Sequence, residues 1–155
     1  MKQIFGVALL LGILGTAYVL YRQAVVSPIF LGLPTVPCID TTKSLGESYT
    51  LRVSITIDGK PYPLDGAIGH DYGNCLRSIY TNDKTGTVYV KANNKNVFTL
   101  GDFFSVWKKV FSASQLMQYQ VGNGHELVVT VDGQTVSTFE RTELSPDASI
   151  NISYR

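Results

Sequence analysis

Hydrophobic and polar residues alternate over Tyr49–Ile57, where every second side chain is apolar. A period of two is typical of a β-strand with one buried face. Asp58-Gly59 follows, a dipeptide that favours a type I′ hairpin turn. The same order returns where Leu127–Val131 leads into Asp132-Gly133 and a second run at residues 134–139. The matching segments, ITIDGK and VTVDGQ, predict two hairpins of one kind.

The spacing of apolar residues becomes helical after Thr99. Thr99–Asp102 resembles a capping box with Asp in the place of the usual Glu. The apolar positions that follow have the spacing i, i+3, i+4 and i+7 and are Phe103, Val106, Trp107 and Val110. This stripe predicts one helix with its aromatic side chains in the core, and Phe104 is the aromatic residue expected to point outward. Lys108 and Lys109 are expected in the last turn, where cations complement the helix dipole.

Two further runs read as strands, Thr87–Ala92 and Ala148–Arg155. The order hairpin, strand, helix, hairpin and terminal strand predicts an α+β domain in which one helix packs across a mixed sheet. A β-grasp-like arrangement is the expected topology, because residues 144–152 are similar to the turn and last strand common in that fold. An immunoglobulin-like β-sandwich is the alternative, and the predicted helix argues against it.

The N-terminus has a different pattern, because residues 4–20 are 17 positions without a charge. With the apolar residues that follow, this run approaches the length that a bilayer requires. We expect a transmembrane signal anchor at residues 1–26 that contacts lipid through residues 4–26. A cleaved signal peptide is the alternative, since Gly15 and Ala17 are small residues that could precede a cut. The apolar side chains of the expected anchor include Ile4, Leu9, Leu10, Leu11, Ile13, Leu14, Val19 and Leu20.

The charges that flank this run predict its direction of insertion. Lys2 and the free amino group outweigh Arg22, so the positive-inside rule puts the N-terminus in the cytoplasm. The expected organisation is then an anchor, a Pro-containing extended stalk at residues 27–47 and an extracytoplasmic α+β domain at residues 48–155. The expected location is the cell membrane, which the chain crosses once.

Charge argues against a nucleic-acid partner. The chain has 13 basic and 12 acidic residues, and two of the basic ones, Lys2 and Arg22, lie in the expected anchor. The remainder therefore carries a formal net charge of −1. Binding of nucleic acid needs a basic face that neutralises phosphates. Binding to a membrane surface through charge needs a polybasic patch. A net charge of −1 argues against both.

The only two cysteines, Cys38 and Cys75, both follow the expected anchor. An even number of cysteines in an oxidising compartment suggests one disulfide. Closure of a loop of this size would stabilise the fold by about 4 kcal/mol in the chain-entropy model. Two unpaired thiols, one of them buried, are the alternative, because the sequence does not set the separation of the two Cα atoms.

Four segments carry a family resemblance, namely Ile57–Gly59, Asn74–Leu76, Tyr80–Gly86 and Phe98–Trp107. Through them Ser48–Tyr154, about two thirds of the chain, resembles a family of small, uncharacterised extracytoplasmic domains of archaea and bacteria that are often membrane-anchored. The resemblance implies the same fold and location. Many members have alternating histidines in the first strand and His-Thr-His-Asp at the positions of Tyr80–Asp83, which together look like a metal site.

This sequence lacks the family's histidines. Other residues stand at those four positions, namely Thr50, Arg52, Tyr80 and Asn82. A transition-metal site needs several imidazole, thiolate or carboxylate ligands that converge. Asp83 and Cys75 alone are too few, so we do not expect the family's metal chemistry here.

The remaining candidates for chemistry are the two histidines. His70 lies in a glycine-rich loop before Cys75, and a Cys–His pair can form an activated nucleophile. The expected alternative is a surface loop with a buried or bridged cysteine. His125 follows a glycine turn and is expected to face solvent. Residual copper or zinc binding by His70, Asp83 and His125 is the alternative to an expected absence of metals and cofactors.

The chain has no P-loop, Rossmann glycine pattern, nucleophile elbow or His-Glu-x-x-His motif. We therefore expect a non-catalytic protein, an accessory or structural subunit whose partners are other subunits of a membrane complex. A metal-binding or metallochaperone domain is one alternative. A cell-surface or filament protein that assembles by strand addition is another, and a secreted hydrolase fits least.

Overall fold

The computed structural model describes residues 36–73 and 75–155. The predicted membrane anchor at residues 1–26, with every apolar side chain assigned to it, lies outside the described residues, as does the first part of the predicted stalk. Within the described part, no helix has the length and apolar character needed to cross a bilayer.

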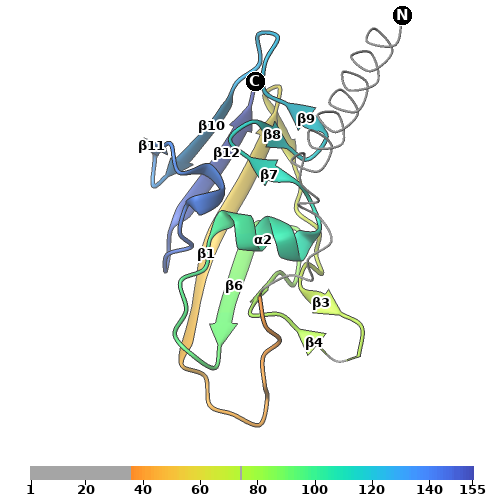
Figure 1. Ribbon diagram of the computed structural model, residues 1–155, viewed down its shortest axis with the longest axis vertical. Coiled ribbons are helices and arrows are strands. Elements are labelled where there is room, and N and C mark those ends of the chain that lie inside the picture. Colours follow the sequence, from red (N-terminus) through yellow and green to blue (C-terminus); the bar gives the residue numbers. More distant parts are fainter. Residues whose placement is uncertain (1–35, 74) are drawn as a thin grey trace, which may run out of the picture. The chain divides into compact units, whose positions relative to one another are not determined.

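One mixed sheet forms the framework of the domain (Figure 1). The central strands β1 and β12 run parallel, in register from Arg52 opposite Ser149 to Ile57 opposite Tyr154. The other neighbouring strands of this sheet run antiparallel. In order across the sheet the strands are β11 (Gln134–Val136), β10 (Leu127–Val131), β12 (Ser149–Tyr154), β1 (Glu47–Ile57), β6 (Thr87–Ala92) and β5 (Ile79–Tyr80), with β2 (Lys60–Tyr62) paired to the C-terminal end of β1.

The other elements are short. The α-helix is α2 (Leu100–Trp107), the 3-10 helix is η1 (Phe139–Arg141), and the small strands are β3 (His70–Asp71), β4 (Cys75–Leu76), β7 (Phe111–Ser112), β8 (Gln115–Leu116) and β9 (Tyr119–Gln120). A sheet-dominated domain with one α-helix among the described residues agrees with the predicted α+β class. The strands of two residues were not predicted, because so short a segment has no detectable period.

The core lies on one face of the sheet. Alternate side chains of β1 point to this face, and Leu51, Val53 and Ile55 are 1–3% exposed, which confirms the predicted alternation. Helix α2 crosses the same face (Figure 1), and its Phe103 side chain is fully buried. The opposite, helix-free face of the central strands carries exposed polar side chains, among them Ser48, Thr50, Arg52, Ser54, Ser149 and Asn151.

Both Asp-Gly turns have the backbone that the sequence predicts. A type I′ turn needs a positive φ at both central residues. The φ angles are 49° and 75° at Asp58 and Gly59, and 50° and 81° at Asp132 and Gly133. Each turn joins an antiparallel pair, β1 with β2 and β10 with β11, so both predicted hairpins form. The predicted run at residues 134–139 is a strand only as far as Val136, and Phe139 begins η1.

The helix begins as predicted and ends early. Thr99 is the N-cap and forms a capping box with Asp102. The last helical residue is Trp107, because Lys108 takes a left-handed conformation with a φ of 61° and its N–H donates back to the preceding turn. Lys108 and Lys109 therefore lie beyond the last turn, and their predicted place within it is wrong.

Phe104 is buried, with 1% of its surface exposed, so its predicted outward position is also wrong. The burial of Phe104 results from a tertiary contact. Strand β7 brings Phe111 back over the helix, where the rings of Phe104 and Phe111 stack with centroids 4.4 Å apart. Helical spacing alone could not indicate this contact.

Candidate functional site

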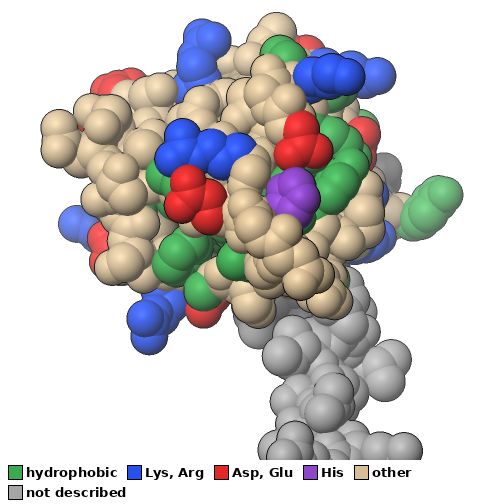
Figure 2. Space-filling view, turned by 90° about the horizontal axis from the view of Figure 1, so that it is seen from above, with side chains coloured by type: hydrophobic (Ala, Val, Ile, Leu, Met, Phe, Trp, Pro, Cys, Tyr) green, Lys and Arg blue, Asp and Glu red, His purple; other side chains and the backbone are tan. Residues whose placement is uncertain are grey.

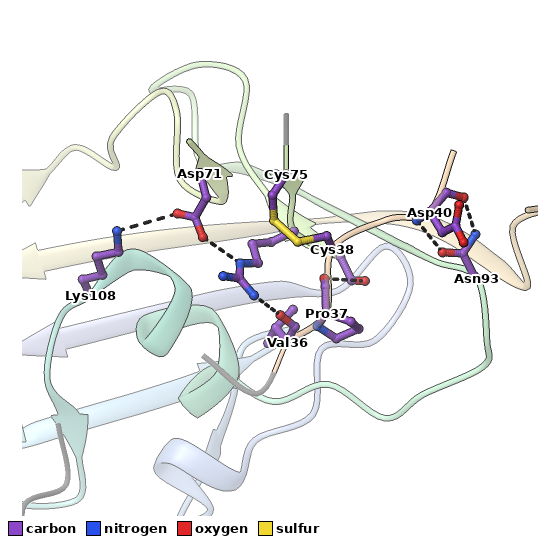
Figure 3. Close-up of a disulfide and its surroundings, with 10 residues drawn as sticks. Val36, Pro37, Cys38, Asp40, Asp71, Cys75, Asn93 and Lys108 are labelled. Carbon is purple, nitrogen blue, oxygen red and sulfur yellow. Dashed lines mark hydrogen bonds and ion pairs between the residues drawn. A yellow bond between two sulfur atoms is a disulfide. The ribbon is translucent and has the colours of Figure 1, made fainter. Parts of the chain in front are cut away.

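The Cys38–Cys75 disulfide fastens the first described residues to β4 (Figure 3). The two Cα atoms are 5.4 Å apart. We call residues 36–40 the clamp segment, because backbone hydrogen bonds hold it on both sides of the bridge. The N–H of Ile39 donates to the carbonyl of Leu76 at 2.7 Å, and the carbonyl of Pro37 accepts from the N–H of Ser78 at 2.9 Å.

Arg77 adds charge to the clamp. Its Nη1 donates to the carbonyl of Val36 and its Nε to Asp71 Oδ2, both at 2.8 Å. The Nζ of Lys108 lies 3.6 Å from the other carboxylate oxygen of Asp71, as Figure 3 shows. The hydrogen bond from Arg77 holds the pKa of Asp71 below its ordinary value. The clamp segment is thus held by a disulfide, by a hydrogen bond from the ion-paired Arg77 and by backbone hydrogen bonds.

Both cysteines of the sequence are in the bridge. A Cys–His nucleophile needs a thiolate, so Cys75 cannot act as a nucleophile with His70 while the disulfide is intact. His70 Nε2 lies 3.1 Å from the carbonyl oxygen of Thr81, and its ring meets the edge of Tyr80.

The other candidate ligands lie in separate networks. The Asp83 carboxylate accepts from the backbone N–H of Thr85 at 2.8 Å. The His125 ring stacks on Tyr154 with centroids 5.0 Å apart, and its Nδ1 is 3.8 Å from Asp58 Oδ1. Figure 2 looks onto this end of the sheet and shows a histidine beside acidic and hydrophobic side chains.

The structure does not bring His70, Asp83 and His125 together. Across residues 36–73 and 75–155 there is no group of three or more His, Cys, Asp or Glu side chains arranged to hold a metal ion. His125 is half exposed, with 45% of its side chain accessible, in keeping with the expectation that it faces solvent.

A groove of about 930 Å³ lies beside the N-terminal half of β1. We call it the β1 groove. Strands β1 and β6 contribute one part of its lining, and two loops contribute the rest. The lining residues are Glu47–Thr50 from β1, Tyr89 and Lys91 from β6, and the loop residues Lys95–Val97 and Glu143–Asp147.

Among the described residues, one side of β1 has no neighbouring strand along the groove. The N–H of Arg52 and the carbonyl of Thr50 point toward the β12 side, where they bond to the backbone of Ala148 and Asp147. Backbone groups two residues apart in a strand point the same way, so those of Ser48 also face this side. The register with β12 begins only at Arg52, and Ser48 therefore faces the groove with no partner strand from residues 36–73 or 75–155.

Tyr49 holds one wall of the groove in place. Its hydroxyl donates to the carbonyl of Leu144 at 2.7 Å, and the N–H of Leu144 donates to the carbonyl of Phe98. Burial raises the pKa of Tyr49 to about 12, with smaller contributions from the negative charges of Glu47 and Glu143. The hydroxyl therefore stays protonated and continues to donate at neutral pH.

Charges of both signs line the groove, and the acidic Glu47 of β1 accepts at Oε1 from the backbone N–H of Asn96 at 3.0 Å. Lys91 is paired across from Ser48 in β6 and Lys95 follows that strand, whereas Glu143 and Asp147 lie in the loop before β12. In the part of the chain that the structure describes, none of the four makes an ion pair within 4.0 Å. Val97, on the wall beside Lys95, is 71% exposed.

These groove residues were not among the sequence-predicted site residues. The alternation over β1 gave a signal for a polar outer face at Ser48 and Thr50, but every half-buried strand has such a face. The groove depends on where β12 begins relative to β1, and a single sequence does not contain that register.

The comparisons with known proteins leave the family question open. The resemblance carried by Ile57–Gly59, Tyr80–Gly86 and Phe98–Trp107 stays a prediction. No protein-family model, no curated protein and no solved structure matches the chain.

Proposed function

We propose that the chain is a non-catalytic domain on the extracytoplasmic side of a membrane, anchored by one N-terminal span, and that it serves as an accessory or structural subunit of a larger membrane complex. The observation that carries the proposal is the disulfide between Cys38 and Cys75. Such bonds persist in oxidising compartments and are rare in the cytosol. The bridge also follows the apolar run at residues 4–26 in the sequence, in keeping with a domain that begins beyond a bilayer.

The β1 groove supports a binding role. It combines a stretch of strand backbone that no described strand pairs with, charges of both signs and the exposed side chain of Val97. Polypeptide partners are recognised through such features, because backbone pairing supplies affinity and the surrounding side chains supply specificity.

We also propose that the domain is β-grasp-like. The first and last long strands form the parallel centre of the sheet. The antiparallel neighbour of β1 is β6, and that of β12 is β10, which pairs in turn with β11. Helix α2 lies between β6 and β10 in the sequence, as the predicted order of hairpin, strand, helix, hairpin and terminal strand requires.

Fractionation tests the location. The full chain, produced in a bacterial host with an oxidising exterior, is expected in the membrane fraction, with the domain open to external protease in intact spheroplasts. Both thiols should resist alkylation until a reductant is added. Replacement of Leu10 by Lys should weaken insertion, because a lysine at the centre of a span costs about 3 kcal/mol. A chain in the cytosol with two freely alkylated thiols would refute the proposed location.

Native mass measurement after gentle detergent extraction tests the role as a subunit. The chain is expected to migrate in a species larger than its own 17.0 kDa, together with other membrane proteins. Migration only as a free monomer would contradict membership of a complex.

A further inference from the structure

We propose that the β1 groove binds an extended segment of a partner polypeptide, which adds as a short strand beside the N-terminal half of β1. This inference rests on the proposed function, because it names the surface through which the accessory subunit would hold its partner. The occupant that we infer is a segment of a different protein with an extended backbone and both an acidic and a basic side chain.

The backbone of β1 indicates the class of ligand. Ser48 directs a donor and an acceptor into the groove from one residue, and Thr50 directs its N–H the same way while its carbonyl is bonded to Asp147. An extended polypeptide matches this spacing of donors and acceptors, as in other cases of strand addition. The occupant would continue the line of β12, whose pairing with β1 ends at Arg52.

The charges of the groove narrow the choice of segment. Lys91 and Lys95 lie on the β6 side, and Glu143 and Asp147 lie in the loop before β12. The carboxylate of Glu47 is on the β6 side as well, but it already accepts from the N–H of Asn96. A segment with an acidic residue toward the lysines and a basic residue toward the carboxylates complements both sides, and such complementarity favours specificity. Val97 offers an apolar contact at the rim, since it is 71% exposed.

The closing experiment uses the full chain in lipid nanodiscs as bait for a displayed library of random short peptides. Selected peptides are synthesised and their affinities measured by fluorescence anisotropy. We expect selected sequences to combine acidic and basic residues, and we expect the amide of Ser48 to exchange with solvent rapidly in the free protein and slowly in the complex.

Two matched changes test for backbone pairing. Ser48→Pro removes the N–H that faces the groove and should weaken peptide binding by about tenfold or more, whereas Ser48→Ala keeps it and should change affinity by less than about twofold. Methylation of alternate peptide nitrogens should abolish binding in one of the two alternations only. This second readout leaves the protein unchanged, so it holds even if the proline variant misfolds.

Several results would overturn the inference. They are selected peptides that bind Ser48→Pro as well as the parent chain, peptides indifferent to methylation, or a Ser48 amide already protected from exchange in the free protein. Self-association that protects Ser48 would assign the groove to a second copy of the chain and would also overturn it. Peptide binding at Ser48 by a chain that fractionates to the cytosol would refute the proposed function and leave this inference intact.

Discussion

The clamp segment and the β1 groove are two places where the sheet meets extended backbone. In the clamp, residues 36–40 lie beside β4 and the residues after it, with Ile39 hydrogen-bonded to Leu76 and Pro37 to Ser78. In the groove, Ser48 presents the same kind of donor and acceptor, and no strand of the described part of the chain pairs with it on that side. Residues of the described chain fill the first position, and none of them fills the second.

The comparison indicates a structural role for the clamp segment and an accessible surface at the β1 groove. Unpaired strand edges attract other chains, and proteins usually cover or charge them. The clamp edge is covered and cross-linked through Cys38 and Cys75. The groove edge is flanked by charged residues, Lys91 on one side and Asp147 on the other, which discourages indiscriminate pairing while it permits a complementary segment.

The largest expected effect comes from cutting the covalent part of the clamp. The double variant Cys38→Ala, Cys75→Ala should lose about 4 kcal/mol of unfolding free energy, because an uncrosslinked unfolded chain gains entropy. Guanidinium unfolding of the full chain, followed by fluorescence of the single tryptophan, measures this loss.

Unfolding in the presence of a reductant is the control for the double variant. The reductant should destabilise the parent chain by a similar amount and leave the double variant unchanged. A loss below about 1 kcal/mol in the variant would show that the clamp does not depend on its bridge.

The next effect concerns Arg77. Arg77→Met removes the donors to Val36 and Asp71 and should cost about 2 kcal/mol, since hydrogen bonds involving charged groups are the stronger ones. Lys108→Met is the matched control. The Lys108 side chain is 71% exposed and its Nζ is 3.6 Å from Asp71, so its loss should cost less than about 1 kcal/mol. Equal losses of unfolding free energy in the two variants would contradict the larger contribution assigned to Arg77.

The ion pair between Arg77 and Asp71 predicts that the unfolding free energy depends on pH in the acid range. Because the pKa of Asp71 is lowered in the folded state, chiefly by Arg77, its contribution to stability is present above the ordinary aspartate pKa of about 4 and is lost as pH falls through the lowered value. Unfolding curves between neutral and acid pH should show a smaller fall for Arg77→Met than for the parent chain.

The sequence predicted the elements that have a measurable period. The alternation over Leu51–Ile57, the strand Thr87–Ala92 and the capping box of Thr99 with Asp102 are all present in the structure. Short strands have no period, and the burial of Phe104 depends on Phe111 from another element. Local patterns therefore specified the framework and missed contacts that only the folded chain creates.

The candidate site follows the same rule. Cys38 and Cys75 were visible as a pair in the sequence, and whether they bridge depended on geometry. Ser48 is one of many polar residues on an alternating strand and had no distinguishing signal. Its position at an open edge results from the register between Arg52 and Ser149, which are far apart in the sequence.

A smaller effect is expected where the groove wall is attached. Tyr49→Phe removes the hydrogen bond to Leu144 and should cost about 1 kcal/mol, the usual net value of a neutral hydrogen bond. Tyr72→Phe is the control, because Tyr72 is fully exposed and should not change the unfolding free energy. A Tyr49 variant as stable as the Tyr72 variant would contradict the attachment.

Tyr49 also predicts an alkaline dependence. Its pKa is raised to about 12 in the folded chain, against an ordinary value of about 10. The stability linked to this shift is fully present below pH 10 and is lost as pH rises through about 12, because the unfolded chain releases its proton first. Unfolding curves over this range should fall less steeply for Tyr49→Phe than for the parent chain.

The smallest expected effect is the sharpest test of the open edge. Proline removes a backbone N–H, which a strand tolerates only where that group has no ladder partner. Ser48→Pro should therefore cost no more than about 1 kcal/mol, while Leu51→Pro, on the paired side and in the core, should cost about 3 kcal/mol or more. Amide exchange in the parent chain should agree, with Ser48 unprotected and Leu51 protected. A proline at position 48 as damaging as one at position 51 would mean that Ser48 is paired after all, and the contrast between the filled clamp and the open groove would disappear.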